Sequence, residues 1–156
     1  MTIATKLERH LTEQHAEYEL VSHPHTGSSH ETAMAAHVPE DHIAKGVLVR
    51  GGNHYYLAVI PADRWLKMDA VNHELDHELE LASEKELGAI FNDCEVGAIP
   101  PIGKAYGIET LRDESLTSLG NVYFEAGDHE HLVLTSGDDF TRLFGGSRHG
   151  YYHYDA

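Results

Sequence analysis

The sequence is poor in cysteine, in basic residues and in long apolar runs, and each shortage excludes a class of protein. Cys94 is the only cysteine, so no disulfide can form within the chain, and we expect a cytoplasmic location. No run of about 18 apolar residues is present, so the sequence predicts no membrane span. The first residues lack a basic start followed by an apolar run, and we therefore expect no signal peptide.

Basic residues are outnumbered by acidic ones, with 11 Lys and Arg against 26 Asp and Glu and a formal net charge of −15. Such a surface repels anionic membranes and nucleic-acid phosphates, so we expect neither a membrane nor DNA as a partner. Any contact with RNA must depend on a local positive site. The 14 histidines would offset part of the negative charge at mildly acidic pH.

Hydrophobic periodicity predicts a single domain in which helices alternate with short strands. Ile3, Leu7 and Leu11 recur every four residues, as on one helix face, and Gly51-Gly52-Asn53 separates two β-rich runs in the manner of a hairpin turn. Hairpins mixed with helices indicate an α+β fold with a mixed sheet. We expect residues 1–145 to form the domain and the Gly-, His- and Tyr-rich residues 146–156 to be a loosely held tail. The expected helices are 5–15, 29–38, 69–75, 84–91 and 137–144, and the expected strands are 18–21, 47–50, 55–60, 78–81, 106–111, 121–125 and 131–135.

Signatures of metal or nucleotide chemistry are weak or absent. Residues 73–77, His-Glu-Leu-Asp-His, fit the zinc-protease pattern H-E-x-x-H, but the surrounding charges indicate a solvated helix and chance matches are common in a chain so rich in His and Glu. The alternating pairs His23/His25 and His129/His131 lack further ligands at familiar spacing. The sequence contains no G-x-S-x-G, Walker A or G-x-G-x-x-G motif. We expect neither a metal nor a cofactor.

Two individual side chains could carry chemistry, and Lys45 is the stronger candidate. Cys94 lies between Asp93 and Glu95, which would raise the pKa of its thiol and disfavour a nucleophile. Lys45 stands at the start of a β run among uncharged neighbours, where a partly buried ammonium needs an anionic or carbonyl partner. An ordinary lysine that extends its charge into solvent remains the alternative for Lys45.

The segment Phe91 to Gly103 predicts a rigid loop that could bind a small carbonyl compound. Gly97 can adopt backbone angles that are closed to other residues and allows a ligand to approach the main chain. Pro100 and Pro101 fix their own φ angles and favour extended geometry in the residue before each. A tight connection without a ligand is the alternative interpretation of the same loop.

Four segments, taken together, carry a resemblance to a known family. They are Ala44-Lys45-Gly46-Val47-Leu48-Val49, Tyr56-Leu57-Ala58-Val59-Ile60-Pro61-Ala62, Leu81-Ala82-Ser83-Glu84-Lys85-Glu86-Leu87 and Asp93-Cys94-Glu95-Val96-Gly97-Ala98-Ile99-Pro100-Pro101-Ile102-Gly103. In this order and spacing they resemble the YbaK and prolyl-tRNA-synthetase-associated editing domain family, over residues 21 to 143. The resemblance implies a compact α+β domain with a mixed, barrel-like sheet that hydrolyses mischarged aminoacyl-tRNA in trans.

The same resemblance implies roles for individual residues. The family's essential lysine corresponds to Lys45 and its Gly-x-x-x-Pro loop to residues 97–101, so we expect Lys45 and Gly97 to be catalytic. Family members often carry Thr or Asn after the lysine, where this chain has Gly46, and that side chain would line the same pocket. The expected substrate-binding residues are Gly46, Ala98, Ile99, Pro100, Pro101 and His131, with His129 as the less favoured alternative to His131.

The expected substrate is a tRNA ester of a small amino acid similar to Cys, Ala or Ser. Lys45 would bind the terminal phosphate or the ester carbonyl, and backbone N–H groups near Gly97 and Ala98 would hold the carbonyl oxygen. Water or the ribose hydroxyl would attack, so no protein nucleophile is needed. The partner would be aminoacyl-tRNA, and the sequence leaves open whether a synthetase delivers it. A non-catalytic module that binds a small ligand or a protein on the same fold is the rival hypothesis.

Overall fold

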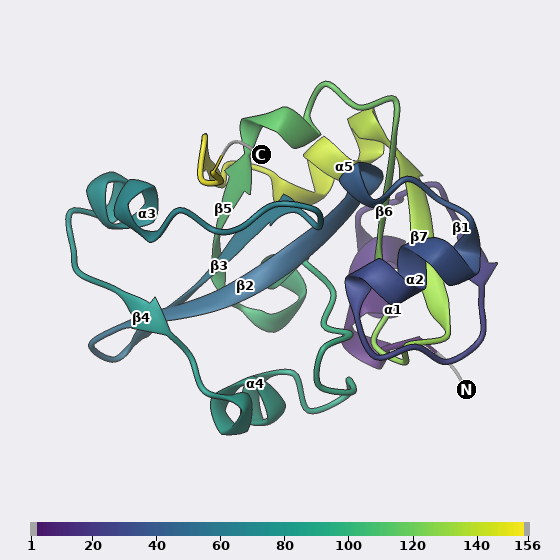
Figure 1. Cartoon of the computed structure of the whole chain (residues 1–156), viewed down its shortest axis with the longest axis horizontal. Coiled ribbons are helices and arrows are strands. Elements are labelled where there is room, and N and C mark those ends of the chain that lie inside the picture. Colours follow the sequence, from purple (N-terminus) through teal and green to yellow (C-terminus); the bar gives the residue numbers. More distant parts are fainter. Residues whose placement is uncertain (1–2, 155–156) are drawn as a thin grey trace.

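Strand β2 (Ile43–Gly51) is the centre of the structure, a computed structural model that describes residues 3–154. Within these residues an eight-stranded mixed sheet has the order β1-β7-β6-β2-β3-β5-β8, with β4 beside β2 (Figure 1). The α+β fold expected from the sequence is therefore confirmed. The other strands are β1 (Tyr18–Ser22), β3 (His54–Pro61), β4 (Glu80–Leu81), β5 (Glu109–Asp113), β6 (Asn121–Glu125), β7 (His131–Ser136) and β8 (Arg148–Gly150). The helices are α1 (Thr5–Glu13), α2 (Ser29–Ala36), α3 (Met68–Leu75), α4 (Glu84–Ile90) and α5 (Gly137–Phe144), with short 3-10 turns at Glu40–His42, Gly103–Tyr106 and Glu114–Leu116.

The expected hairpin joins β2 to β3 and is longer than the sequence predicted. The pair Gly51↔His54 closes it across a two-residue turn, and Gly52 adopts the positive φ (60°) that such a turn requires. Pairing continues to Ala44↔Pro61 at the other end. Lys45 is thus the third residue of a long central strand.

The other edge of β2 is only partly paired, and this leaves a gap in the sheet. Its first residues pair in parallel with β6, at Ile43↔Tyr123 and Ala44↔Phe124. Its last residues pair with β4, at Val49↔Leu81 and Arg50↔Glu80. Within residues 3–154, positions 45–48 have no strand partner on this edge. The main chain of Lys45 to Val47 is the open part of this edge, because the Leu48 carbonyl accepts a hydrogen bond from the Ala82 N–H (3.0 Å).

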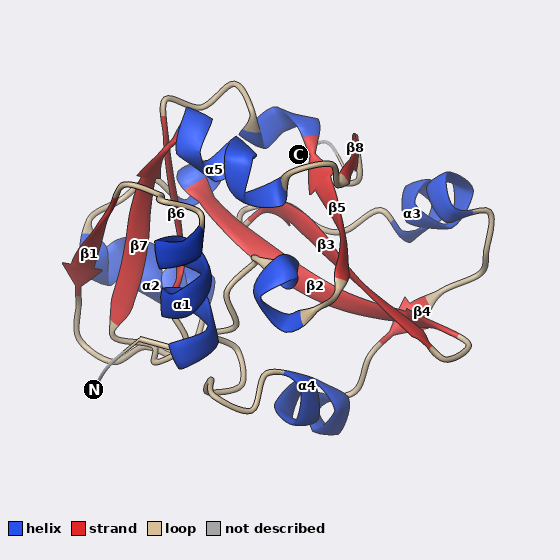
Figure 2. Cartoon of the chain, turned by 180° about the vertical axis from the view of Figure 1, so that it is seen from behind, coloured by secondary structure: helices blue, strands red, loops and turns tan. Residues whose placement is uncertain are grey.

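Two helices cover opposite faces of the β1-β7-β6 half of the sheet. Helix α1 packs Leu7 and Leu11 against the face that carries Phe124, whereas α2 packs Ala33 against the face that carries Leu132. Figures 1 and 2, seen from opposite sides, show α2 in front of these strands in one view and α1 in the other. Ser28 caps α2 by accepting a hydrogen bond from the Glu31 N–H, three residues further along the chain.

The C-terminal residues differ from the expected loose tail. Residues 148–150 form β8, which pairs in parallel with β5, and the side chain of Tyr152 is buried. The buried Asp113 carboxylate accepts a hydrogen bond from the Tyr152 N–H (2.8 Å) and lies 2.7 Å from Nδ1 of His153. A buried carboxylate needs such partners, which is why this segment packs; residues 155–156 lie outside the described range.

Two further boundaries need correction. The strand expected at 106–111 is shifted, because Gly103–Tyr106 forms a 3-10 turn and β5 begins at Glu109. The strand expected at 78–81 is reduced to Glu80–Leu81. Over residues 3–154, no helix combines the length and the apolar character that crossing a bilayer would require.

Candidate functional site

The gap along β2 opens into a cavity of about 320 Å³. Its walls come from five separate parts of the chain, which places residues that are distant in sequence around one small space. Volumes of this size are typical of sites for small molecules. The lining residues are Ser29, Lys45, Gly46, Val47, Leu48, Leu81, Ala82, Leu87, Gly97, Ile99 and Glu125.

Lys45 contributes the cationic group of the cavity wall. Burial lowers the pKa of its ammonium group, and the negative charges of Glu40 and Asp63 act in the opposite direction. The ammonium lies 5.8 Å from the centre of the exposed Trp65 ring. Lys45 also lines a second hollow of about 380 Å³, together with Trp65 and Arg64, so it stands between two adjoining spaces.

The loop after α4 brings Gly97 and Ile99 to the same cavity. Gly97 has a φ of 90°, a conformation that residues with side chains rarely adopt. Ala98, Pro100 and Pro101 are buried behind the wall and do not line the cavity. Of the loop residues predicted to touch a substrate, only Gly97 and Ile99 therefore face the space.

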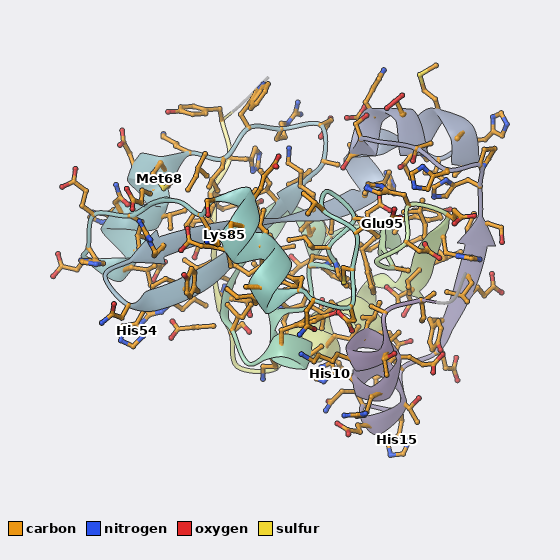
Figure 3. All side chains as sticks on the ribbon, turned by 90° about the horizontal axis from the view of Figure 1, so that it is seen from below. His10, His15, His54, Met68, Lys85 and Glu95 are labelled. Atoms are coloured by element: carbon orange, nitrogen blue, oxygen red, sulfur yellow. The ribbon has the colours of Figure 1, made fainter. Side chains whose placement is uncertain are left out.

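The turn between β6 and β7 holds this loop in place. The Glu95 N–H donates a hydrogen bond to the Gly127 carbonyl (2.8 Å), and Nε2–H of His129 donates to the Val96 carbonyl (3.0 Å). His129 is buried and its ring would lie 3.4 Å from a Cβ on Gly97. The loop carries Glu95, which Figure 3 labels.

His131, the favoured histidine of the sequence analysis, lies elsewhere. Its Nδ1 is 2.6 Å from Oδ2 of Asp128, and it is not among the residues that line the cavity. Of these two histidines, His129 is the one that contacts the Gly97 loop. The two residues alternate on the chain, so the sequence alone could not decide which ring faces the loop.

Glu125 is a cavity residue that the sequence analysis missed. It ends β6 next to the start of β2, it is 4% exposed, and its Oε2 accepts a hydrogen bond from the Thr32 hydroxyl (3.1 Å). Burial, with a smaller contribution from the charge of Asp128, raises the pKa of this carboxyl to about 7. The available signal was an acidic residue closing a strand that is otherwise largely apolar and aromatic.

The space that a side chain on Gly46 would need is occupied by the side chain of Leu57. A Cβ on Gly46 would lie 2.9 Å from Cδ1 of Leu57, whose side chain is fully buried. The absent side chain would therefore point at the Leu57 core position. This differs from the expectation that it would line the pocket, although Gly46 itself does so through its main chain.

Cys94 and the H-E-x-x-H match are the remaining candidates, and neither has the surroundings that its chemistry would need. Burial raises the pKa of the Cys94 thiol to about 12, and its Sγ lies 3.3 Å from both the Tyr106 hydroxyl and an Asp93 carboxylate oxygen. Helix α3 ends at Leu75, and Asp76 adopts a left-handed conformation, so the second histidine of the H-E-x-x-H match is not on the helix. No cluster of three or more His, Cys, Asp or Glu side chains suited to a metal occurs within residues 3–154.

Comparison with known proteins gives one family and several similar structures. The sequence profile described as "Aminoacyl-tRNA editing domain" matches residues 23–143. The hypothetical protein APE2540 superimposes with a TM-score of 0.85 at 23% identity, covering 96% of this chain and 99% of the other. A proposed trans-editing enzyme for prolyl tRNA synthetase gives 0.83 at 19% identity, with 97% of each chain covered. A proposed signal transduction protein from Marinobacter aquaeolei VT8 gives 0.80 at 16% identity, and there the match covers 99% of this chain but 31% of the other. No curated protein matches the sequence.

Proposed function

The chain belongs to the aminoacyl-tRNA editing domain family, and on this basis we propose that it hydrolyses the ester of a mischarged tRNA in trans. The family is one of deacylases. The observation that carries the proposal is that Lys45 and the Gly97 loop line one cavity, since the family's essential lysine and its Gly-x-x-x-Pro loop correspond to these residues.

Lys45 is the group proposed to hold the reacting end of the tRNA. Its ammonium would bind the terminal phosphate or the ester carbonyl. The partly buried position strengthens such a contact because few water molecules compete for the charge. Among residues 3–154, removing this side chain leaves no other Lys or Arg on the cavity wall.

The Gly97 N–H is the proposed donor to the carbonyl oxygen as negative charge develops. The Ala98 N–H, which the sequence analysis also considered, already donates to the Glu95 carbonyl (3.1 Å). Within residues 3–154 the Gly97 N–H makes no hydrogen bond. In a trans peptide the N–H and C=O point in opposite directions, so the bond from His129 to the Val96 carbonyl also fixes the direction of the Gly97 N–H. His129 is thus a positioning residue.

The cavity size supports a small amino acid as the esterified group. About 320 Å³ must hold the aminoacyl group and the reacting part of the ribose, which favours side chains similar to those of Cys, Ala or Ser. The buried Pro100 and Pro101 support the loop from behind and keep this size fixed. The terminal adenosine would occupy the second hollow, where the exposed Trp65 offers a stacking surface.

Deacylation of a panel of charged tRNAs, including Cys-, Ala- and Ser-tRNA, tests this function. Wild type should hydrolyse at least one of them, and Lys45→Ala should lose the activity by about 100-fold or more while its circular dichroism spectrum is unchanged. Lys104→Ala, which removes an exposed lysine outside the cavity, is the matched control and should remain active. A folded Lys45→Ala protein with full activity would refute the assignment.

A binding module without catalysis is the second candidate, and the net charge of −15 favours it. Such a module would leave every charged tRNA intact while still binding a small ligand in the cavity. Salt dependence separates the two functions, because each contact to a tRNA phosphate weakens as salt rises whereas the binding of a neutral ligand changes little.

A further inference from the structure

The Glu125 carboxyl group is an ionisable group of the cavity wall that the proposed mechanism does not use. It lies beside Lys45: β2 and β6 pair at Ala44↔Phe124, and the next residues along the two parallel strands are Lys45 and Glu125. Side chains alternate along a strand, so both project on the same face of the sheet, the face that α2 covers. The two charged groups of the wall thus start from adjacent positions.

One oxygen of this carboxyl group is satisfied and the other is not. Thr32 donates its hydroxyl proton to Oε2, and the Thr32 oxygen lies 2.6 Å from the Thr26 hydroxyl, which can donate to it in turn. Oε1 is buried and has no hydrogen-bond partner within the described part of the chain. A buried polar atom without a partner is costly and needs an explanation, and a ligand that completes the bonding would supply one.

The neighbouring lysine does not fill this role. The charges that act on the Lys45 ammonium are those of Glu40 and Asp63, and Trp65 lies over it, all at the second hollow. Glu125 lines the cavity, so its unpaired acceptor lies at the wall, closed to solvent in the free protein, and a cation that reached it would be stabilised by charge and by a hydrogen bond.

We propose that Oε1 of Glu125 receives the α-ammonium group of the aminoacyl ester and so selects substrates with a free α-amino group. This inference rests on the proposed function, and it specifies which part of the substrate the site recognises. All aminoacyl-tRNAs share the α-amino group, whichever small side chain they carry. Esters whose amino group is acylated, such as peptidyl-tRNA, lack the cation and would be spared.

Two non-hydrolysable analogues separate this contact from the rest of the site. 3′-Alanylamino-3′-deoxyadenosine carries the amino group, and 3′-propionylamino-3′-deoxyadenosine differs only in lacking it. At pH 8, wild type should bind the first about tenfold or more tightly than the second, the value expected of a hydrogen bond to a charged group. Glu125→Gln should reduce the preference to about twofold by weakening only the first, and Glu78→Gln, an exposed glutamate outside the cavity, should keep it.

Each result is decisive when deacylation is measured in parallel. Equal binding of both analogues to wild type, with deacylation present, would overturn the role of Glu125 and leave the proposed function standing. A preference retained in Glu125→Gln would likewise assign the ammonium to another group. No binding of either analogue together with no deacylation would overturn the proposed function itself. The wild-type comparison needs no variant, and by itself it tests whether the amino group is recognised at all.

Discussion

Glu125 should make the stability of the protein depend on pH in an unusual direction. Its pKa is raised from 4.5 to about 7 in the folded state, so between these values the folded protein binds more protons than the unfolded chain. The contribution of the raised pKa to the free energy of unfolding is fully present below pH 4.5 and is lost as the pH rises through 7. Asp128 adds to the shift, Thr32 opposes it, and Lys45 is the adjacent cation on the sheet.

We expect Glu125→Gln to remove this loss. Its free energy of unfolding in urea should exceed that of wild type by up to about 3 kcal/mol at pH 8, and the difference should shrink towards pH 5. Glu78→Gln is the control, because it makes the same replacement of a carboxylic acid by an amide at an exposed site. A difference between Glu125→Gln and wild type that is the same at both pH values would show that the carboxyl does not titrate in this range.

The two alternating histidines can be separated by their effects on turnover. His129→Ala breaks the bond that orients the Val96–Gly97 peptide, so kcat should fall by about 10- to 100-fold with little change in KM. His129→Gln keeps an N–H donor and should restore part of kcat. His131→Ala breaks only the contact with Asp128. The opposite pattern, with the larger loss of kcat in His131→Ala, would return the assignment to His131.

At the scale of elements, the contact between β2 and β3 explains why a glycine follows the lysine. Gly46→Thr would force its side chain against the buried Leu57, and such overpacking costs about 1–3 kcal/mol. In a Leu57→Ala background the same substitution should cost much less, because the space is then open. Urea unfolding of wild type, both single variants and the double variant measures the coupling; additive effects would mean that the two side chains do not compete.

Sequence patterns determine the elements here better than they determine the site. The hairpin turn at Gly52 and the helix of residues 137–144 depend on local chemistry, and both are found as expected. Strand β8 and the buried Tyr152 lie against Asp113, a buried carboxylate that is distant in sequence and needs hydrogen-bond partners. No local sequence pattern predicts such a contact. Glu125 was missed for the same reason, since its position beside Lys45 follows from a parallel pairing between distant strands.

At the scale of the whole molecule, the net charge of −15 limits how a tRNA can bind. Polar and charged side chains project around the whole outline in Figure 3, and acidic residues outnumber basic ones by more than two to one. At long range the protein therefore repels tRNA, and affinity must come from a few contacts near the cavity. Lys45 and Arg64 line the second hollow and are the cations placed to make them.

The salt dependence of tRNA binding should therefore be shallow and should depend on Arg64. With about two phosphate contacts, the slope of log K against log salt should be near −2, and Arg64→Ala should reduce it by about one unit while weakening binding at about 50 mM salt. Arg9→Ala, an exposed arginine on α1 far from the second hollow in sequence and absent from its lining, should leave the slope unchanged. Titration of a 3′-CCA minihelix by fluorescence anisotropy at several salt concentrations measures these slopes. An equal effect of the two variants would mean that the RNA is held by diffuse charge, and it would remove the second hollow as the place where the tRNA end docks.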